Sequence, residues 1–300
     1  MWKPSVLVFL CTIIGFFNCS FAESLCEAAG KGYLSLVISS LENGANINEK
    51  DADGATPLAS AVWNGRDTIA KYLVEKGASL STRDNFGNTL LMYCASKGNL
   101  AITKYLVEKG CLINVTIPNS VSSPASIAFK KGNIDIWKYL ILHGADVNSK
   151  MDSDSNSYMS YVVSAGIIDL IRFLFTKNAY PDSKNKNGET PLMVAAQKGY
   201  TDIVTLLLDH GASAIATNSE DRTPLMFAAS GYDGTRAVYE NEIYGYPVRI
   251  QIDHVEVARI LIGKKAKPKE KDLSGKTAYE IALESQHIDN GMVDFLSNYK

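Results

Sequence analysis

The residue types that most often bind metals or act as catalytic bases are sparse in this 300-residue chain, which contains four histidines and five cysteines. No two histidines stand at the spacing that brings metal ligands together on one helix face. Each histidine also falls at a recurring place in the sequence, either just before a glycine or at the start of a predicted helix. The sequence therefore predicts no metal site, no cofactor and no catalytic base at His143, His210, His254 or His287.

One triplet, Gly275-Lys276-Thr277, is similar to the end of a phosphate-binding loop. Such a loop needs a second glycine five residues earlier, where this chain has Glu270, and the triplet aligns with the repeated turn Gly54-Ala55-Thr56. The sequence also lacks the Gly-x-Ser-x-Gly elbow of serine hydrolases and the His-Glu-x-x-His helix of zinc proteases. We therefore expect no catalytic residue and a protein that is not an enzyme.

The first 22 residues are typical of a signal peptide. Lys3 is their one charge, and an uncharged run from Pro4 to Ala22 ends in small residues. The mature chain is expected to start at Glu23 and to be exported, either to a periplasm or by secretion. Two alternatives stay open. One is an uncleaved anchor, because the 19 uncharged residues approach the roughly 20 that span a bilayer. The other is lipidation at Cys19. Membrane contact is expected only in those two cases.

The composition indicates a folded protein that is not a general nucleic-acid binder. Apolar residues make up 46% of the chain and charged residues 21%, while 30 basic and 32 acidic residues give a net charge of -2. Removal of the leader leaves Cys26, Cys94 and Cys111, without a Cys-x-x-Cys pair. An odd number of cysteines leaves at least one free or intermolecular thiol, and we expect small buried thiols.

A phrase of about 33 residues recurs along the whole mature chain. Thr-Pro-Leu occurs at residues 56–58, 190–192 and 223–225, followed by two small residues, a glycine, an aliphatic run and Gly-Ala. The first glycine after the small pair recurs with spacings of 33, 33, 34, 34 and 33 residues, at Gly32, Gly65, Gly98, Gly132, Gly166 and Gly199. Such a fixed period predicts a repeat architecture.

Each repeat is predicted to fold as two short helices and an extended turn. Thr56 would cap the first helix and Pro57 would occupy its first turn, where a missing N–H costs nothing. Gly65 would end this helix in a left-handed conformation, and a second helix would run over residues 67–76. A single repeat cannot bury its apolar stripe, so neighbouring repeats are expected to stack.

In this period and this phrase, the sequence resembles the ankyrin repeat family. The resemblance implies an all-α solenoid of about eight helix-turn-helix units with short extended turns, preceded by the signal peptide, and a function in protein recognition without turnover. After the leader, residues 1–22, the array 23–300 divides into units 23–50, 51–83, 84–117, 118–151, 152–184, 185–217, 218–271 with an insertion at 231–251, and a cap at 272–300.

The two units over residues 118–184 depart from the pattern. Ser123-Pro124-Ala125 and Ser157-Tyr158-Met159 replace Thr-Pro-Leu, and Asn178 replaces the glycine that ends the second helix. We expect these units to lose good helix caps and to form the least stable part of the array, with fast amide exchange.

The concave face of such an array, formed by the outer side of the first helices, is the predicted binding surface. Aromatic and lysine side chains recur on it, which favours a protein partner that has acidic residues around apolar anchors. Solvated lysines and sideways-packed rings are the alternative explanation. We expect a monomer that binds no nucleic acid, with partner contacts at Trp63, Phe86, Tyr93, Lys97, Lys130, Lys131, Tyr161, Lys198 and Phe227.

The insertion separates the two helices of its unit and carries four tyrosines. Its second half alternates apolar residues, which indicates a β-hairpin. It is either a tolerated surface loop, a flap that contacts the partner, or, in an alternative function, the wall of a ligand site or active site formed against the concave face. The tyrosines are Tyr232, Tyr239, Tyr244 and Tyr246.

A basic cluster lies at the turn into the last unit, around Pro268. Solvation near a helix end, where the dipole favours cations, is the ordinary explanation, and contact with an anionic polymer or lipid is the other. Its members are Lys264, Lys265, Lys267, Lys269 and Lys271.

Overall fold

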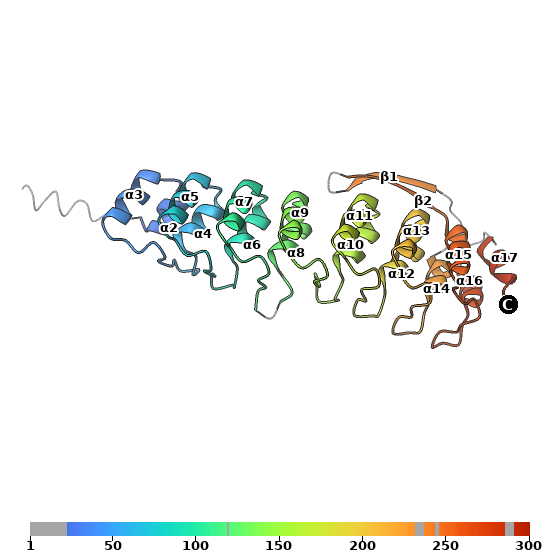
Figure 1. The fold of residues 1–300 in the computed structure, drawn as a ribbon. Coiled ribbons are helices and arrows are strands. Elements are labelled where there is room, and N and C mark those ends of the chain that lie inside the picture. The colour runs from blue at the N-terminus through green and yellow to red at the C-terminus, as the bar shows by residue number, and fades with distance from the viewer. Residues whose placement is uncertain (1–22, 119, 232–236, 244–245, 286–290) are drawn as a thin grey trace, which may run out of the picture. The chain divides into compact units, whose positions relative to one another are not determined.

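The computed structural model describes residues 23–118, 120–231, 237–243, 246–285 and 291–300 (Figure 1). The chain divides into two compact units, Met1–Pro118 and Asn119–Lys300. The predicted signal peptide and the side chains of Tyr232 and Tyr244 lie outside the described residues. No helix in the described ranges is long and apolar enough to cross a membrane.

The described part of the first unit, residues 23–118, consists of three helix pairs. Thr56 Oγ1 accepts a hydrogen bond of 3.3 Å from the Ala59 amide at the start of one first helix, as the repeat phrase predicts. Gly98 ends the next first helix with a φ of 79°, a conformation that side chains resist. The pairs are α2 (Leu25–Lys31) with α3 (Leu34–Glu42), α4 (Pro57–Trp63) with α5 (Asp67–Glu75), and α6 (Leu90–Lys97) with α7 (Leu100–Glu108).

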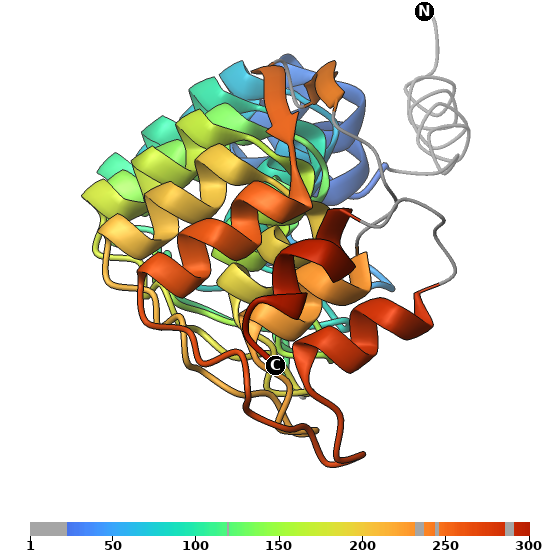
Figure 2. The ribbon, with the colours of Figure 1, turned by 90° about the vertical axis from the view of Figure 1, so that its right-hand side faces the viewer.

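In its described residues, the second unit has five helix pairs and a hairpin. Its second helices lie side by side in one row, its first helices form a second row, and the extended turns project from one edge (Figure 2). The pairs are α8 (Pro124–Lys130) with α9 (Ile134–Leu142), α10 (Tyr158–Ala165) with α11 (Ile168–Thr176), α12 (Pro191–Lys198) with α13 (Thr201–Asp209), α14 (Pro224–Gly231) with α15 (His254–Gly263), and α16 (Ala278–Glu284) with α17 (Gly291–Ser297).

Lysine and arginine side chains tie successive extended turns together. Lys50 Nζ donates to the Arg83 carbonyl oxygen over 2.9 Å, and Arg83 Nη1 donates to the Thr116 carbonyl oxygen over 2.9 Å. In the second unit, Lys150 donates in the same way to Lys184 over 2.7 Å, and Lys184 to Thr217 over 2.8 Å. Each bond satisfies a backbone acceptor of the next repeat. In the last repeat of the first unit, Thr116 stands where the preceding repeats have Lys50 and Arg83. It lies two residues before the division between the units.

The expectation that residues 118–184 lose their helix caps is wrong. Ser123 forms a capping box with Ser126, and Ser157 accepts a hydrogen bond from the Ser160 amide over 3.2 Å. Serine serves because the cap needs one side-chain oxygen, which it supplies as threonine does. Asn178 replaces glycine with a φ of 60°, a conformation that asparagine tolerates.

A cluster of aromatic rings fills the core at the beginning of the second unit. Phe129 lies 5.1 Å from Trp137 and 5.6 Å from Tyr158, between ring centroids, in edge-to-face arrangements. All three side chains are fully buried. Such pairs contribute beyond the area they bury. The repeats that lack the Thr-Pro-Leu phrase therefore carry the largest core side chains.

The insertion forms a two-stranded antiparallel hairpin, β1 (Ala237–Ile243) and β2 (Tyr246–Ile252), paired from Ala237↔Ile252 to Ile243↔Tyr246. It extends from the turn between α14 and α15 and lies along α13 and α11 (Figure 1). Ile252 forms an isolated bridge with Tyr200 at the start of α13. The repeats are all-α, as predicted, and this hairpin is the one sheet of the described chain.

Candidate functional site

A cluster of two aromatic rings and one lysine lies on the first helices of the first unit. Trp63, the last residue of α4, packs edge-to-face on Tyr93 of α6, with 5.4 Å between the ring centroids. Lys97, one turn after Tyr93, places its Nζ 3.8 Å from the centre of the Trp63 ring. The Trp63 side chain is still 43% exposed. We call these three residues the Trp63 cluster.

The extended turn before α6 fixes the tyrosine of this cluster. The Tyr93 hydroxyl donates to Asp84 Oδ2 over 2.6 Å, and Asp84 also accepts hydrogen bonds from the amides of Phe86 and Asn88. Partial burial would raise the pKa of Asp84, but these hydrogen bonds outweigh it and lower the pKa below its usual value. The turn also holds Phe86 outward, with its ring 68% exposed.

A matching contact occurs in the second unit, two repeats later in the sequence. The Tyr161 hydroxyl donates to Asp152 Oδ2 over 2.6 Å, and the Tyr161 ring packs on Phe129 with 6.3 Å between centroids. The spacing of nine residues between Asp and Tyr is the same as in Asp84 and Tyr93. The helix positions of the repeat do not reveal these acids, but the repeated spacing of nine residues between Asp and Tyr does. The surface is therefore less basic than the helix residues alone suggest.

The remaining lysines of the predicted surface differ in what they contact. Lys130 directs its amine to the carbonyl oxygen of Met151, so a backbone acceptor engages it. Lys131 and Lys198 have exposed side chains. Beside Tyr161 lies a small cleft of about 190 Å³, lined mostly by polar residues of the α10 and α12 repeats.

The prediction that Phe227 is available to a partner is wrong. Its side chain is only 5% exposed, and the Arg222 guanidinium carbon lies 5.0 Å from the ring centre. Helix α14 buries almost its whole surface, since it packs between α12 and α16 and meets α15 as well. The Phe227 ring therefore packs within the array, as the alternative explanation of sideways-packed rings supposed.

The tyrosines of the insertion lie away from the first helices where the structure describes them. The Tyr246 hydroxyl oxygen accepts a hydrogen bond from the Lys138 amine on α9, and Lys138 Nζ lies 4.8 Å from the Tyr246 ring centre. Tyr239 pairs with Ile250 in the hairpin, and its side chain lies outside the described set. The hairpin contacts that are described involve second helices, so they give no support to a ligand site formed between the insertion and the concave face.

The histidines have structural surroundings wherever they are described. His143 stacks on Tyr139 at 3.9 Å, His210 stacks on Phe175 at 4.0 Å, and His254 lies 3.0 Å from the Gln197 carbonyl oxygen. His287 lies outside the described residues.

The three described cysteines are free and buried. Burial raises the pKa of Cys26 and of Cys94 to about 12 and that of Cys111 to about 11, so the unreactive thiol form dominates at neutral pH. Within the described ranges, no group of three histidine, cysteine or carboxylate residues is placed to hold a metal ion.

Comparison with known proteins agrees with the observed helix pairs. The model for "Ankyrin repeats (3 copies)" matches residues 25–119, 82–151 and 159–245, which cover most of the chain. A comparison with curated proteins finds no match. By its repeat phrase, its helix pairs and this match, the chain belongs to the ankyrin repeat family.

Proposed function

We propose that this protein is a non-catalytic scaffold that binds another protein through the first helices and extended turns of its first unit. Ankyrin repeats generally serve as scaffolds for protein–protein interaction. The observation that carries the proposal for this chain is the Trp63 cluster, which leaves a large aromatic side chain 43% exposed. Tryptophan and tyrosine are enriched among the residues that dominate binding energy in protein interfaces.

The cluster is ordered before any partner arrives. Trp63 has Tyr93 at its edge and Lys97 over its face, and Asp84 holds Tyr93 by its hydroxyl. Binding therefore costs little side-chain entropy in these residues of the cluster. Phe86 adds a second exposed ring on the adjacent turn.

The chemistry of the cluster indicates what the partner presents. An apolar side chain would cover the exposed part of Trp63, and a carboxylate would approach Lys97, whose other contact is the aromatic ring. Asp84 is already engaged by Tyr93 and by backbone amides, so it offers little to a basic partner. An acidic surface around an apolar anchor fits best.

The proposal places binding outside the cell interior, because the first 22 residues have the pattern of a signal peptide. The mature chain would meet its partner in a periplasm or in the extracellular medium. Mass spectrometry of the purified protein from its own cells would test this directly, since cleavage predicts an N-terminus at Glu23.

Affinity capture from the exported fraction tests the binding surface. We expect the variants Trp63→Ala and Lys97→Glu each to bind the captured partner with an affinity at least tenfold lower, which corresponds to a loss of about 1.4 kcal/mol in binding free energy. Tyr33→Ala is the control, because it removes another exposed aromatic ring of the same unit. Equal capture by all variants would exclude the Trp63 cluster as the binding surface.

A further inference from the structure

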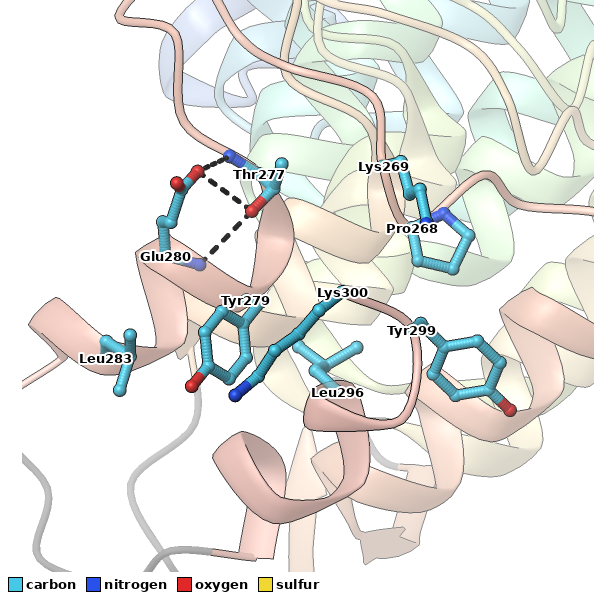
Figure 3. Close-up of a pocket in the computed structure, with 9 residues that line it drawn as sticks. All are labelled: Pro268, Lys269, Thr277, Tyr279, Glu280, Leu283, Leu296, Tyr299 and Lys300. Atoms are coloured by element: carbon cyan, nitrogen blue, oxygen red, sulfur yellow. Dashed lines mark hydrogen bonds between the residues drawn. The ribbon is translucent and has the colours of Figure 1, made fainter.

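A groove lies at the end of the second unit, between the last helix pair and the turn that precedes it (Figure 3). It has a volume of about 390 Å³, which falls within the range of about 300–1,000 Å³ typical of ligand pockets. The residues that line it are Pro268, Lys269, Thr277, Tyr279, Glu280, Leu283, Leu296, Tyr299 and Lys300.

The floor and sides of this C-terminal groove are apolar. Leu296 of α17 is buried at its base, while Leu283 of α16 is 54% exposed at its edge. The rings of Tyr279 and Tyr299 stand on either side, and Pro268 closes the end near the turn (Figure 3). The shape suits one projecting apolar or aromatic side chain rather than a flat surface.

Positive charge that is not neutralised locally is concentrated around this groove. Three lysines of the same region form ion pairs: Lys264 with Asp209, Lys267 with Glu270 and Lys276 with Glu284. Within the described residues, Lys269 and Lys300, which line the groove, form no ion pair with a carboxylate. Lys300 instead lies over the Tyr279 ring, 4.5 Å from its centre.

The carboxylate side chain that lines the groove in the described part of the chain, Glu280, is already hydrogen-bonded. Glu280 Oε2 accepts hydrogen bonds from the Thr277 amide over 2.7 Å and from the Thr277 hydroxyl over 2.9 Å. These bonds form the capping box of α16 and lower the pKa of Glu280, so it stays ionised and turned toward the helix start. The groove therefore presents apolar walls with lysines at the rim.

From this combination, we propose that the C-terminal groove binds an extended peptide segment of a partner protein in which an apolar side chain is flanked by carboxylates. The apolar side chain would enter over Leu296 between Tyr279 and Tyr299, with Leu283 at the edge, and the flanking carboxylates would meet Lys269 and Lys300. This site is separate from the Trp63 cluster and does not depend on it, because all its residues belong to the second unit. It also gives Lys269, one member of the basic cluster around Pro268, a role beyond solvation.

The test uses the full mature chain and the labelled peptide Asp-Asp-Phe-Asp-Asp, with binding followed by fluorescence anisotropy. We expect Leu283→Glu and Lys269→Glu each to weaken peptide binding about tenfold or more. The free energy of a tenfold change is smaller than that gained by burying a phenylalanine side chain, so a loss of this size is within reach. The matched control is Leu273→Glu, because Leu273 is 71% exposed and does not line the groove. Circular dichroism would verify that each variant is folded.

Three results would overturn the proposal. They are a failure of the wild-type chain to bind the peptide at millimolar concentration, equal binding of Asp-Asp-Ala-Asp-Asp, and equal losses in the Leu273→Glu control. If the peptide does not bind, binding to phosphatidylglycerol vesicles would assign the groove to lipid instead. Trp63→Ala is expected to bind the peptide as the wild type does, so this proposal and the proposed function fail separately.

Discussion

The contact between Lys138 of α9 and Tyr246 of β2 is expected to hold the hairpin against the second helices of the repeats in the second compact unit. Lys138 Nζ lies 4.8 Å from the Tyr246 ring centre and 5.4 Å from that of Phe173, and it donates a hydrogen bond to the Tyr246 hydroxyl. A hydrogen bond to a charged group contributes about 1.5–3 kcal/mol and a cation–π contact about 0.5–1 kcal/mol. Allowing for partial exposure of Lys138, we expect about 1–2 kcal/mol of coupling between the two side chains.

Native-state amide exchange of the full chain measures this coupling where it acts. The variants are Lys138→Met, Tyr246→Phe and their combination, with Lys186→Met as a control at an exposed lysine of the same unit. A loss of 1–2 kcal/mol corresponds to exchange about 5- to 30-fold faster in β1 and β2. Helix α12, a first helix two repeats after the one that contains Lys138, should keep its protection.

The double variant distinguishes a direct contact from two separate effects. If Lys138 and Tyr246 stabilise the hairpin through each other, the combined change should be smaller than the sum of the single changes by about 1 kcal/mol or more. Additive changes within about 0.3 kcal/mol, or hairpin protection that stays at the wild-type level in every variant, would refute the reasoning.

Three further outcomes follow from the packing. Phe227→Ala should lower the free energy of unfolding by about 3–5 kcal/mol in urea titrations, because the ring is buried; a loss below about 1 kcal/mol would contradict its core position. The native thiols of Cys26, Cys94 and Cys111 should react with Ellman's reagent at pH 8 only after unfolding, and a thiol that reacts at once would be exposed. Because the folded-state pKa of Asp84 lies below its unfolded value, its stabilising effect is present above about pH 4 and is lost as the pH falls through the folded pKa. Asp84→Asn should therefore flatten the pH dependence of stability in acid, and an unchanged slope would show that the Asp84–Tyr93 bond contributes nothing.

The helix pairs were predictable because local rules set them. Threonine capped α4 at Thr56, glycine ended α6 at Gly98, and the interruption of one unit placed the insertion between Gly231 and His254. These outcomes depend on residues within one turn of one another, which a sequence displays directly. The alternating apolar residues of the insertion likewise indicated its hairpin.

The exposure of individual side chains was less predictable, because it depends on neighbouring repeats. Phe227 occupies the same position in the repeat as Tyr93 and Tyr161, yet Arg222 and the adjacent helices cover it. A hydrogen bond joins Tyr93 to Asp84, although Tyr93 lies in a helix and Asp84 lies in the preceding turn. The direction of the hairpin depends on a contact between residues 108 positions apart, Lys138 and Tyr246, which no local pattern reveals.

The central claim, that the first unit binds a protein through the Trp63 cluster, is tested most directly by site-specific photocrosslinking in the producing cells. A benzophenone amino acid would replace Asn64, which is exposed next to Trp63, and in a second variant Tyr33, which is exposed elsewhere in the unit. We predict a discrete protein adduct from position 64 and none from position 33. Equal adducts from both positions, or no protein adduct from position 64, would contradict the claim.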